Sequence, residues 1–149
     1  MTPETYRPRL EAAIRALFED REPAAAIALL RDDVRLKPPT YWKTWEGVEP
    51  VRRLLGFAAN NIDKLIYTHI YWDGPHAAFQ FIGVVGGYDI SGVDLVTLDE
   101  AGLITEIEIA ARPPKAVALL GERMGASLGK DPFFATAASK AAEPAESRS

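Results

Sequence analysis

Between residues 64 and 111 the sequence holds four β-rich runs, and the turn signals between them constrain the fold more than any other feature. The runs are Lys64–Trp72, Ala77–Val85, Tyr88–Leu98 and Leu103–Ala111. They are separated by Asp-Gly-Pro, Gly-Gly and Asp-Glu-Ala-Gly segments, which are typical of tight connections between antiparallel strands. The second half of the chain therefore predicts a meander of hairpins that forms an antiparallel sheet.

Helical patterns come before and after this meander. The first has the i, i+3, i+4, i+7, i+8 spacing of one apolar helix face and consists of Leu10, Ala13, Ile14, Leu17 and Phe18. Further helices are expected from Pro23, from about Val48 and across residues 117–124, with a short strand at residues 34–36. Helices grouped outside an antiparallel sheet cover one of its faces, so the predicted fold class is α+β.

The length of 149 residues argues for a single domain. We expect this domain to span residues 1–128, because residues 129–149 are rich in Ala, Ser, Glu and Pro and have little to bury. This segment is predicted to be a mobile tail, in which Phe133 and Phe134 could dock on the domain or on a neighbouring subunit. The chain has no cysteine, which excludes disulfides, thiolate metal sites and cysteine nucleophiles.

The charge balance argues against several classes of partner. A net charge of -4 with interspersed signs does not favour nucleic-acid binding. The longest apolar run, Ala24–Leu30, is far shorter than a membrane span, and no export signal is visible, so a cytoplasmic location is expected. Two isolated histidines without ligand spacing predict no metal site, and no motif calls for a cofactor.

Strand alternation assigns side chains to the two faces of the sheet. Ile107 and Ile109 face inward, because Glu106 and Glu108 alternate with them. With two-residue turns at residues 73–74 and 86–87, the same inner face carries five further residues, namely Trp72, Phe79, Phe81, Tyr88 and Asp94. A one-residue slip of the register would exchange the two faces.

The opposite face of the predicted sheet is too apolar to meet only water. Its residues include Tyr67, His69, Tyr71, Ile82 and Val84. We interpret this face as the interface of a homodimer.

The inner face predicts an apolar pocket for a small apolar or aromatic ligand. Asp94 is its single carboxylate and the one catalytic candidate, because a desolvated carboxyl can donate or accept a proton; the alternative is a core carboxylate satisfied by a buried partner. Trp42 and Trp45 form either a pocket lip or a plug of the open end. The predicted ligand-binding residues are Trp42, Trp45, Trp72, Phe79, Phe81, Tyr88, Asp94, Ile107 and Ile109.

Three segments resemble bacterial SnoaL-like proteins of the nuclear transport factor 2-like superfamily. They are ALLRDDVRLKPP, TWEGVEPVRRLL and ISGVDLVTLDEAGLITEIEIAARPPKAVALL. The third contains the family's Gly-x-Asp strand, its Asp-x-x-Gly-x-Ile turn and an Arg-Pro pair before the last helix. The resemblance implies a curved antiparallel sheet wrapped around helices into a cone with an internal pocket.

The same resemblance bears on activity. It places Asp94 where ketosteroid isomerase has a protonated aspartate in its oxyanion hole, but Pro38 stands at the position of that enzyme's general base and Ile14 at that of its catalytic tyrosine. The first hypothesis is therefore a protein that binds a small, largely apolar molecule. The alternatives are a cofactor-independent acid–base enzyme that uses Asp94 (an isomerase, cyclase, dehydratase or epoxide hydrolase) and a structural or dimerisation module with a filled cavity.

Overall fold

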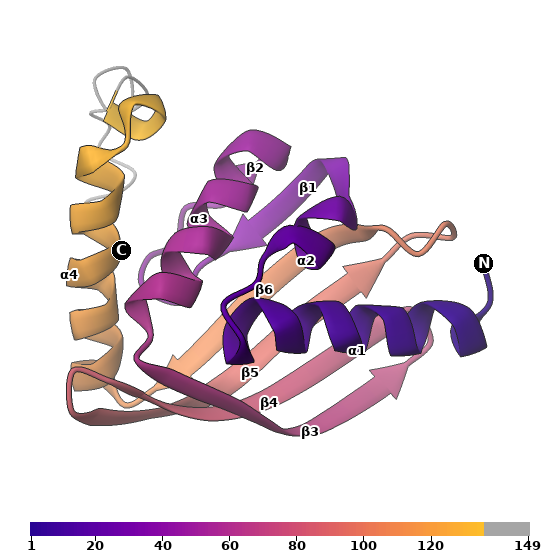
Figure 1. Ribbon diagram of the computed structural model, residues 1–149, viewed down its shortest axis with the longest axis horizontal. Helices are drawn as coiled ribbons and strands as arrows, with labels where there is room; N and C mark the ends of the chain where they lie inside the picture. The colour runs from indigo at the N-terminus through magenta and orange to yellow at the C-terminus, as the bar shows by residue number, and fades with distance from the viewer. Residues whose placement is uncertain (136–149) are drawn as a thin grey trace.

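The chain folds into a six-stranded sheet with helices on one side (Figure 1), as a computed structural model of the chain shows; the structure describes residues 1–135. The elements in chain order are α1 (Pro3–Glu19), α2 (Ala24–Ala28), β1 (Leu30–Lys37), β2 (Trp45–Glu46), α3 (Val48–Asn61), β3 (Lys64–Asp73), β4 (His76–Val85), β5 (Tyr88–Leu98), β6 (Ile104–Arg112) and α4 (Pro114–Lys130). The predicted α+β class is confirmed. None of the helices in residues 1–135 has the length and apolar character needed to span a membrane.

The strand order in the sheet is β2-β1-β6-β5-β4-β3. Strands β3 to β6 form consecutive antiparallel hairpins, as predicted. Strand β1, however, pairs in parallel with β6, so the sheet is mixed rather than wholly antiparallel. No hairpin fixes the direction of β1 relative to β6, because α3 and four strands lie between them in the chain.

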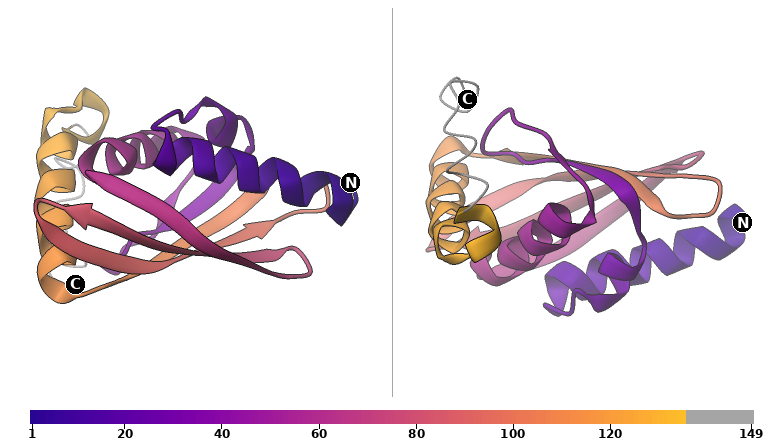
Figure 2. Two further views of the ribbon diagram at one scale, coloured as in Figure 1. Left: turned by 60° about the horizontal axis from the view of Figure 1, so that its bottom comes forward. Right: turned by 90° about the horizontal axis from the view of Figure 1, so that it is seen from above.

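The helices lie over the concave face of the sheet, and the core is formed between these two layers. Helices α1, α2 and α3 lie on one side of the curved strands, while α4 stands across one end of the sheet (Figures 1 and 2). The expected apolar face of α1 is buried, with Leu10 and Leu17 fully inaccessible. This arrangement agrees with the curved sheet wrapped around helices that the resemblance implies.

The β4–β5 hairpin has the predicted register. Val85 pairs with Tyr88 across Gly86–Gly87, whose φ values of 55° and 85° suit the turn that glycine favours between twisted strands. Asp94 consequently lies between Phe79 of β4 and Ile109 of β6 on the concave face.

The β3–β4 hairpin departs from the prediction in two ways. Its turn is Gly74–Pro75, not residues 73–74, which shifts the pairing without exchanging faces, since Trp72 still shares a face with Phe79. The register then shifts between Tyr67 and His69, where Thr68 is an extra residue that forms a β-bulge. Before the bulge the faces are exchanged: Leu65 and Tyr67 are buried, whereas Ile66 is 44% exposed. The prediction that put Tyr67 on the convex face is therefore wrong.

The segment after α4 begins the predicted tail. Phe134 is only 2% exposed, and its ring lies 5.3 Å from that of Trp45 and 6.0 Å from that of Phe57. Asp131 forms an ion pair with Arg53, with 2.8 Å between the carboxylate oxygen and the guanidinium nitrogen. The start of the tail is thus part of the core, while residues 136–149 of the predicted tail lie outside the described residues.

This packing gives a prediction for stability. Phe134→Ala should lower the free energy of unfolding by about 3 kcal/mol, the cost of removing a buried phenyl ring. Phe133→Ala is the matched control and should cost about 1 kcal/mol or less, because Phe133 is exposed. Urea unfolding of the two variants measures both values, and equal small losses would contradict the assignment of Phe134 to the core.

Candidate functional site

Asp94 is the centre of the candidate site. It is 4% exposed and, apart from the tyrosines Tyr6 and Tyr67, is the only residue with a polar or charged side chain that is buried within residues 1–135. Its neighbours along and across the strands are apolar, so one carboxyl lies in a hydrophobic interior. The Tyr67 hydroxyl donates a hydrogen bond of 2.5 Å to Asp94 Oδ2, and we call these two residues the Tyr67–Asp94 pair.

The surroundings change the acidity of both groups. Burial raises the pKa of Asp94 to about 7, although the hydrogen bond from Tyr67 acts in the opposite direction. Burial also raises the pKa of Tyr67 well above its usual value, and the negative charge of Asp94 adds to this effect. Tyr67 is therefore a hydrogen-bond donor at physiological pH, while Asp94 is poised between its neutral and charged forms.

Tyr67 reaches Asp94 because of the β-bulge in β3. With an uninterrupted strand its side chain would point to the convex face, as the alternation in the sequence predicted. Instead the ring is enclosed by the aromatic rings of Phe18, Phe79 and Phe81, all edge-on at 5.6–6.4 Å. Sequence reasoning missed Tyr67 because a bulge leaves no reliable signal in a single β-rich run.

A small internal cavity of about 60 Å³ lies beside Asp94. Its walls come from α3, α4, the concave face and the loop Pro38–Tyr41. Besides Asp94, the polar side chains that line it are those of Thr40 and Tyr41. Tyr67 lies behind Asp94 and is not part of the lining. The cavity is thus an apolar hollow with one acidic group in its wall.

Three of the predicted ligand-binding residues line this cavity, namely Phe81, Asp94 and Ile109. Phe81 can lie close to Asp94 because its partner on β5 is Gly92, where a Cβ atom would come within 2.9 Å of the Phe81 ring. Phe79 and Ile107 are buried in the core but lie outside the lining.

The predicted tryptophans and Tyr88 lie elsewhere. Trp42 is 89% exposed and faces an outer groove that Arg35 and Lys37 also line. Trp45 lies in β2 against Phe134 and donates a hydrogen bond of 2.7 Å to Tyr41, which connects it indirectly to the cavity wall.

Trp72 does not line the cavity and packs against α1. It donates a hydrogen bond of 2.8 Å to Glu11 and lies under the Arg7 guanidinium. Strand alternation puts Tyr88 on the concave face, but it is 46% exposed because it is the first residue of β5, at the hairpin end.

Pro38 and Ile14, which the resemblance placed at the positions of the general base and the catalytic tyrosine of ketosteroid isomerase, both have apolar neighbours. Pro38 lines the cavity, and Asp94 is the only acid among the lining residues. Ile14 lies in the α1 core at 2% exposure. A tyrosine does meet the buried aspartate, but it comes from β3 and not from α1.

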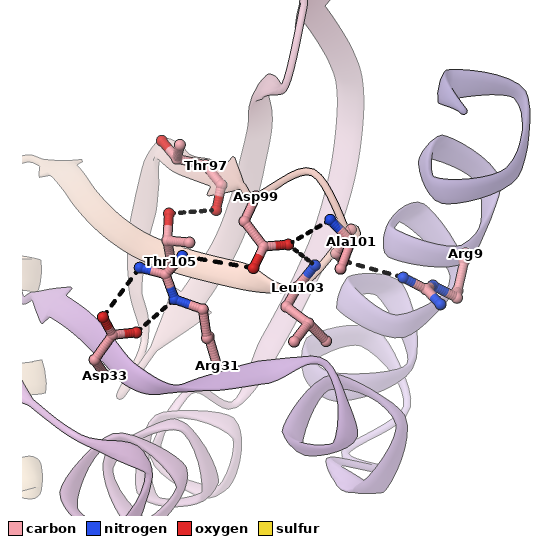
Figure 3. A network of polar contacts seen from close by, with 9 residues as sticks. Arg9, Arg31, Asp33, Thr97, Asp99, Ala101, Leu103 and Thr105 are labelled. Carbon is pink, nitrogen blue, oxygen red and sulfur yellow. Dashed lines mark hydrogen bonds and ion pairs between the residues drawn. The ribbon is translucent and has the colours of Figure 1, made fainter. Parts of the chain in front are cut away.

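A second polar cluster lies at the β5–β6 turn and has a structural role (Figure 3). Asp99 Oδ1 accepts backbone N–H groups from Ala101 and Leu103, both at 2.9 Å, and Arg31 lies 3.5 Å from its other oxygen. These bonds hold the Asp-x-x-Gly turn that the sequence singled out. Within residues 1–135, no group of three or more His, Asp or Glu residues is placed to hold a metal ion.

Comparison with solved structures finds close relatives of this fold. An uncharacterised bacterial protein with a cystatin-like fold from Silicibacter pomeroyi is 36% identical, with a TM-score of 0.79 over 89% of this chain and 91% of that protein. A steroid delta-isomerase from Pseudomonas aeruginosa is 24% identical, with a TM-score of 0.77 over 83% of this chain and 91% of the other.

A third similar structure is a nuclear transport factor 2-like protein of unknown function from Cytophaga hutchinsonii, with 20% identity and a TM-score of 0.60 over 74% of this chain and 93% of that one. The second and third likenesses are ones of fold. Protein-family models and curated proteins give no match. Given the mixed curved sheet, the helices on its concave face and the relative that is 36% identical over 89% of this chain, the chain belongs to the nuclear transport factor 2-like superfamily.

Proposed function

We propose that the protein binds a small, largely apolar molecule in the cavity beside Asp94, with one polar group of the ligand at the Asp94 carboxyl. The observation that carries this proposal is a buried carboxyl with a pKa of about 7 in an otherwise apolar wall. A scaffold alone has no need of such a group, because burying a carboxyl costs free energy. In its neutral form the carboxyl can donate a hydrogen bond to a carbonyl or hydroxyl oxygen.

The small volume of the cavity either limits the size of the ligand or requires a neighbouring loop to move. Its volume of about 60 Å³ is far below the roughly 300–1,000 Å³ of typical small-molecule sites. The loop Pro38–Tyr41 separates it from an open groove of about 830 Å³ that the same four residues line. The ligand therefore either consists of a few heavy atoms or enters when this loop moves outward.

A size series tests the proposal directly. We expect ketones and alcohols of increasing size to raise the melting temperature of the protein, and alkanes of the same shape to do so less, because ligand binding stabilises the folded state. Native mass spectrometry of the purified protein is the companion measurement. If no compound of any size binds, the result supports the structural module with a filled cavity instead.

The pKa of Asp94 gives a second prediction, on pH. Because burial raises this pKa to about 7, the neutral donor form is present below that pH and is lost above it. Affinity for a carbonyl ligand should fall about 30-fold between about pH 5.5 and about pH 8.5, in proportion to the neutral fraction. Calorimetric titration at the two pH values measures the change.

Asp94→Asn is the matched variant for this experiment. Its amide keeps a donor but does not titrate, so its affinity should be the same at both pH values. A wild-type affinity that does not change with pH would contradict the role of the neutral carboxyl.

A second candidate function is acid–base catalysis by Asp94. It is favoured by the same pKa of about 7, since a group that titrates near neutrality is effective in proton transfer. The two functions separate in the Asp94→Asn variant, in which an enzyme would keep ligand affinity and lose turnover. Turnover that is unchanged in this variant would remove Asp94 from catalysis.

The convex face supports the further proposal of a homodimer. Four large apolar side chains are 42–55% exposed on three adjacent strands of this face, namely Ile66, Tyr71, Ile82 and Leu95. Strand pairing puts Lys64 and Arg112, together with the single acid Asp89, toward one end of the face, and Glu108 toward the other. A twofold, antiparallel pairing of two such faces would cover the apolar side chains and bring opposite charges together.

Light scattering during gel filtration tests this proposal. We expect the wild-type chain to have the mass of a dimer, and Ile82→Glu to have that of a monomer, because the new charge would be buried in the interface. Ala25→Glu places the same charge on an exposed residue of α2, on the helix-covered side of the sheet (Figure 1), and should remain dimeric. A monomeric wild-type protein would contradict the proposal.

A further inference from the structure

The backbone of Tyr67 is held from outside the sheet by two side chains of α1. Strand β3 is the last strand of the sheet, so the N–H and C=O groups on its outer edge have no strand partner. Glu19 Oε2 accepts the Tyr67 N–H at 2.8 Å, and Arg15 donates to the Tyr67 carbonyl oxygen at 3.5 Å. Arg15 and Glu19 also form an ion pair at 2.9 Å. We call these two residues the edge clamp.

The edge clamp is located next to the β-bulge. The register of β3 changes between Tyr67 and His69, directly after the clamped residue. With this change in register the Tyr67 side chain points to the concave face of the sheet, whereas in an uninterrupted strand it would point to the convex face. The Glu19 carboxyl is half-buried, with 23% of its side chain exposed, so it competes less with water for the N–H than a fully exposed group would.

We propose that Glu19 is a positioning residue for the Tyr67–Asp94 pair: by accepting the Tyr67 N–H, it fixes the bulged conformation of β3 that directs the Tyr67 hydroxyl to Asp94. The value of this positioning for ligand binding rests on the proposed function. The positioning itself can be measured without any ligand.

The charges around the two sites allow the hydrogen bond to be separated from electrostatics. The pKa of Asp94 responds to burial and to the Tyr67 hydroxyl, and the other titratable side chain in the cavity lining is that of Tyr41. Glu19 acts on the pKa of Tyr67, which its charge raises while Arg15 lowers it, but it is not among the groups that shift the pKa of Asp94. A change of the Asp94 pKa in a Glu19 variant would therefore report on geometry.

The experiment is a titration of the Asp94 carboxyl carbon by NMR in the full chain and four variants. Tyr67→Phe is the reference, and should raise the pKa of Asp94 by about 1 unit, because a hydrogen bond that stabilises the carboxylate is removed. Glu19→Ala should shift the pKa in the same direction by at least about half as much. Glu19→Gln keeps an oxygen that accepts the N–H and should give the wild-type value.

Glu11→Ala is the matched control for damage to the helix–strand contact. Glu11 is also on α1 and also accepts a hydrogen bond from β3, but from the Trp72 indole, away from the bulge. It should leave the pKa of Asp94 unchanged even where it lowers stability.

A folded Glu19→Ala protein with the wild-type Asp94 pKa overturns the proposal, as does a Glu11→Ala protein with an equal shift. If Tyr67→Phe does not move the pKa, the premise of a Tyr67–Asp94 hydrogen bond fails, and the proposal with it. If the expected shifts are found but no ligand binds any variant, the positioning role is supported and only the proposed function fails.

Discussion

The structure depends on one buried carboxyl and the hydroxyl that meets it. Asp94 lies on the concave face between Phe79 and Ile109 of the two neighbouring strands, with Tyr67 as its hydrogen-bond partner at 2.5 Å. Because a carboxyl in such surroundings is costly to ionise, the arrangement of the neighbouring elements determines its state. Helices α3 and α4 supply the apolar walls of the cavity, and β3 supplies the donor. Their positions explain why the pKa of Asp94 lies near neutrality rather than near that of an exposed aspartate.

Much of this arrangement follows from short-range patterns in the sequence. The Gly86–Gly87 turn predicted the parity of β4 and β5, and so put Phe81 and Asp94 on one face. The alternation of Ile109 with Glu106 and Glu108 put it on the inner face of β6, where it pairs with Asp94. The meander and the helix faces were predicted for the same reason: hairpin turns and apolar periodicity depend only on residues near one another in the chain.

The features that could not be predicted from the sequence depend on contacts between residues that are distant in the chain. The bulge in β3 depends on which edge groups α1 can satisfy, and Glu19 is 48 residues from Tyr67 in the chain. The parallel pairing of β1 with β6 likewise joins segments that are far apart. None of the three indoles lines the cavity, and the sequence could not show this because an aromatic side chain is equally suited to a pocket wall, a core or a helix contact. Thus the indole N–H of Trp72 donates a hydrogen bond to Glu11, and that of Trp45 donates one to Tyr41.

The small cavity and the acidic group together constrain how any ligand would act. A ligand that replaces water beside Asp94 makes its surroundings drier, and a drier site disfavours the charged carboxylate further. Since its pKa is already about 7, binding near neutral pH would then be accompanied by proton uptake at this carboxyl. The same coupling works in reverse, because ionisation of Asp94 would draw water into the cavity and oppose an apolar ligand. Proton and ligand are thus linked through the hydration of one group, and the Tyr67 hydroxyl limits how far the pKa can rise.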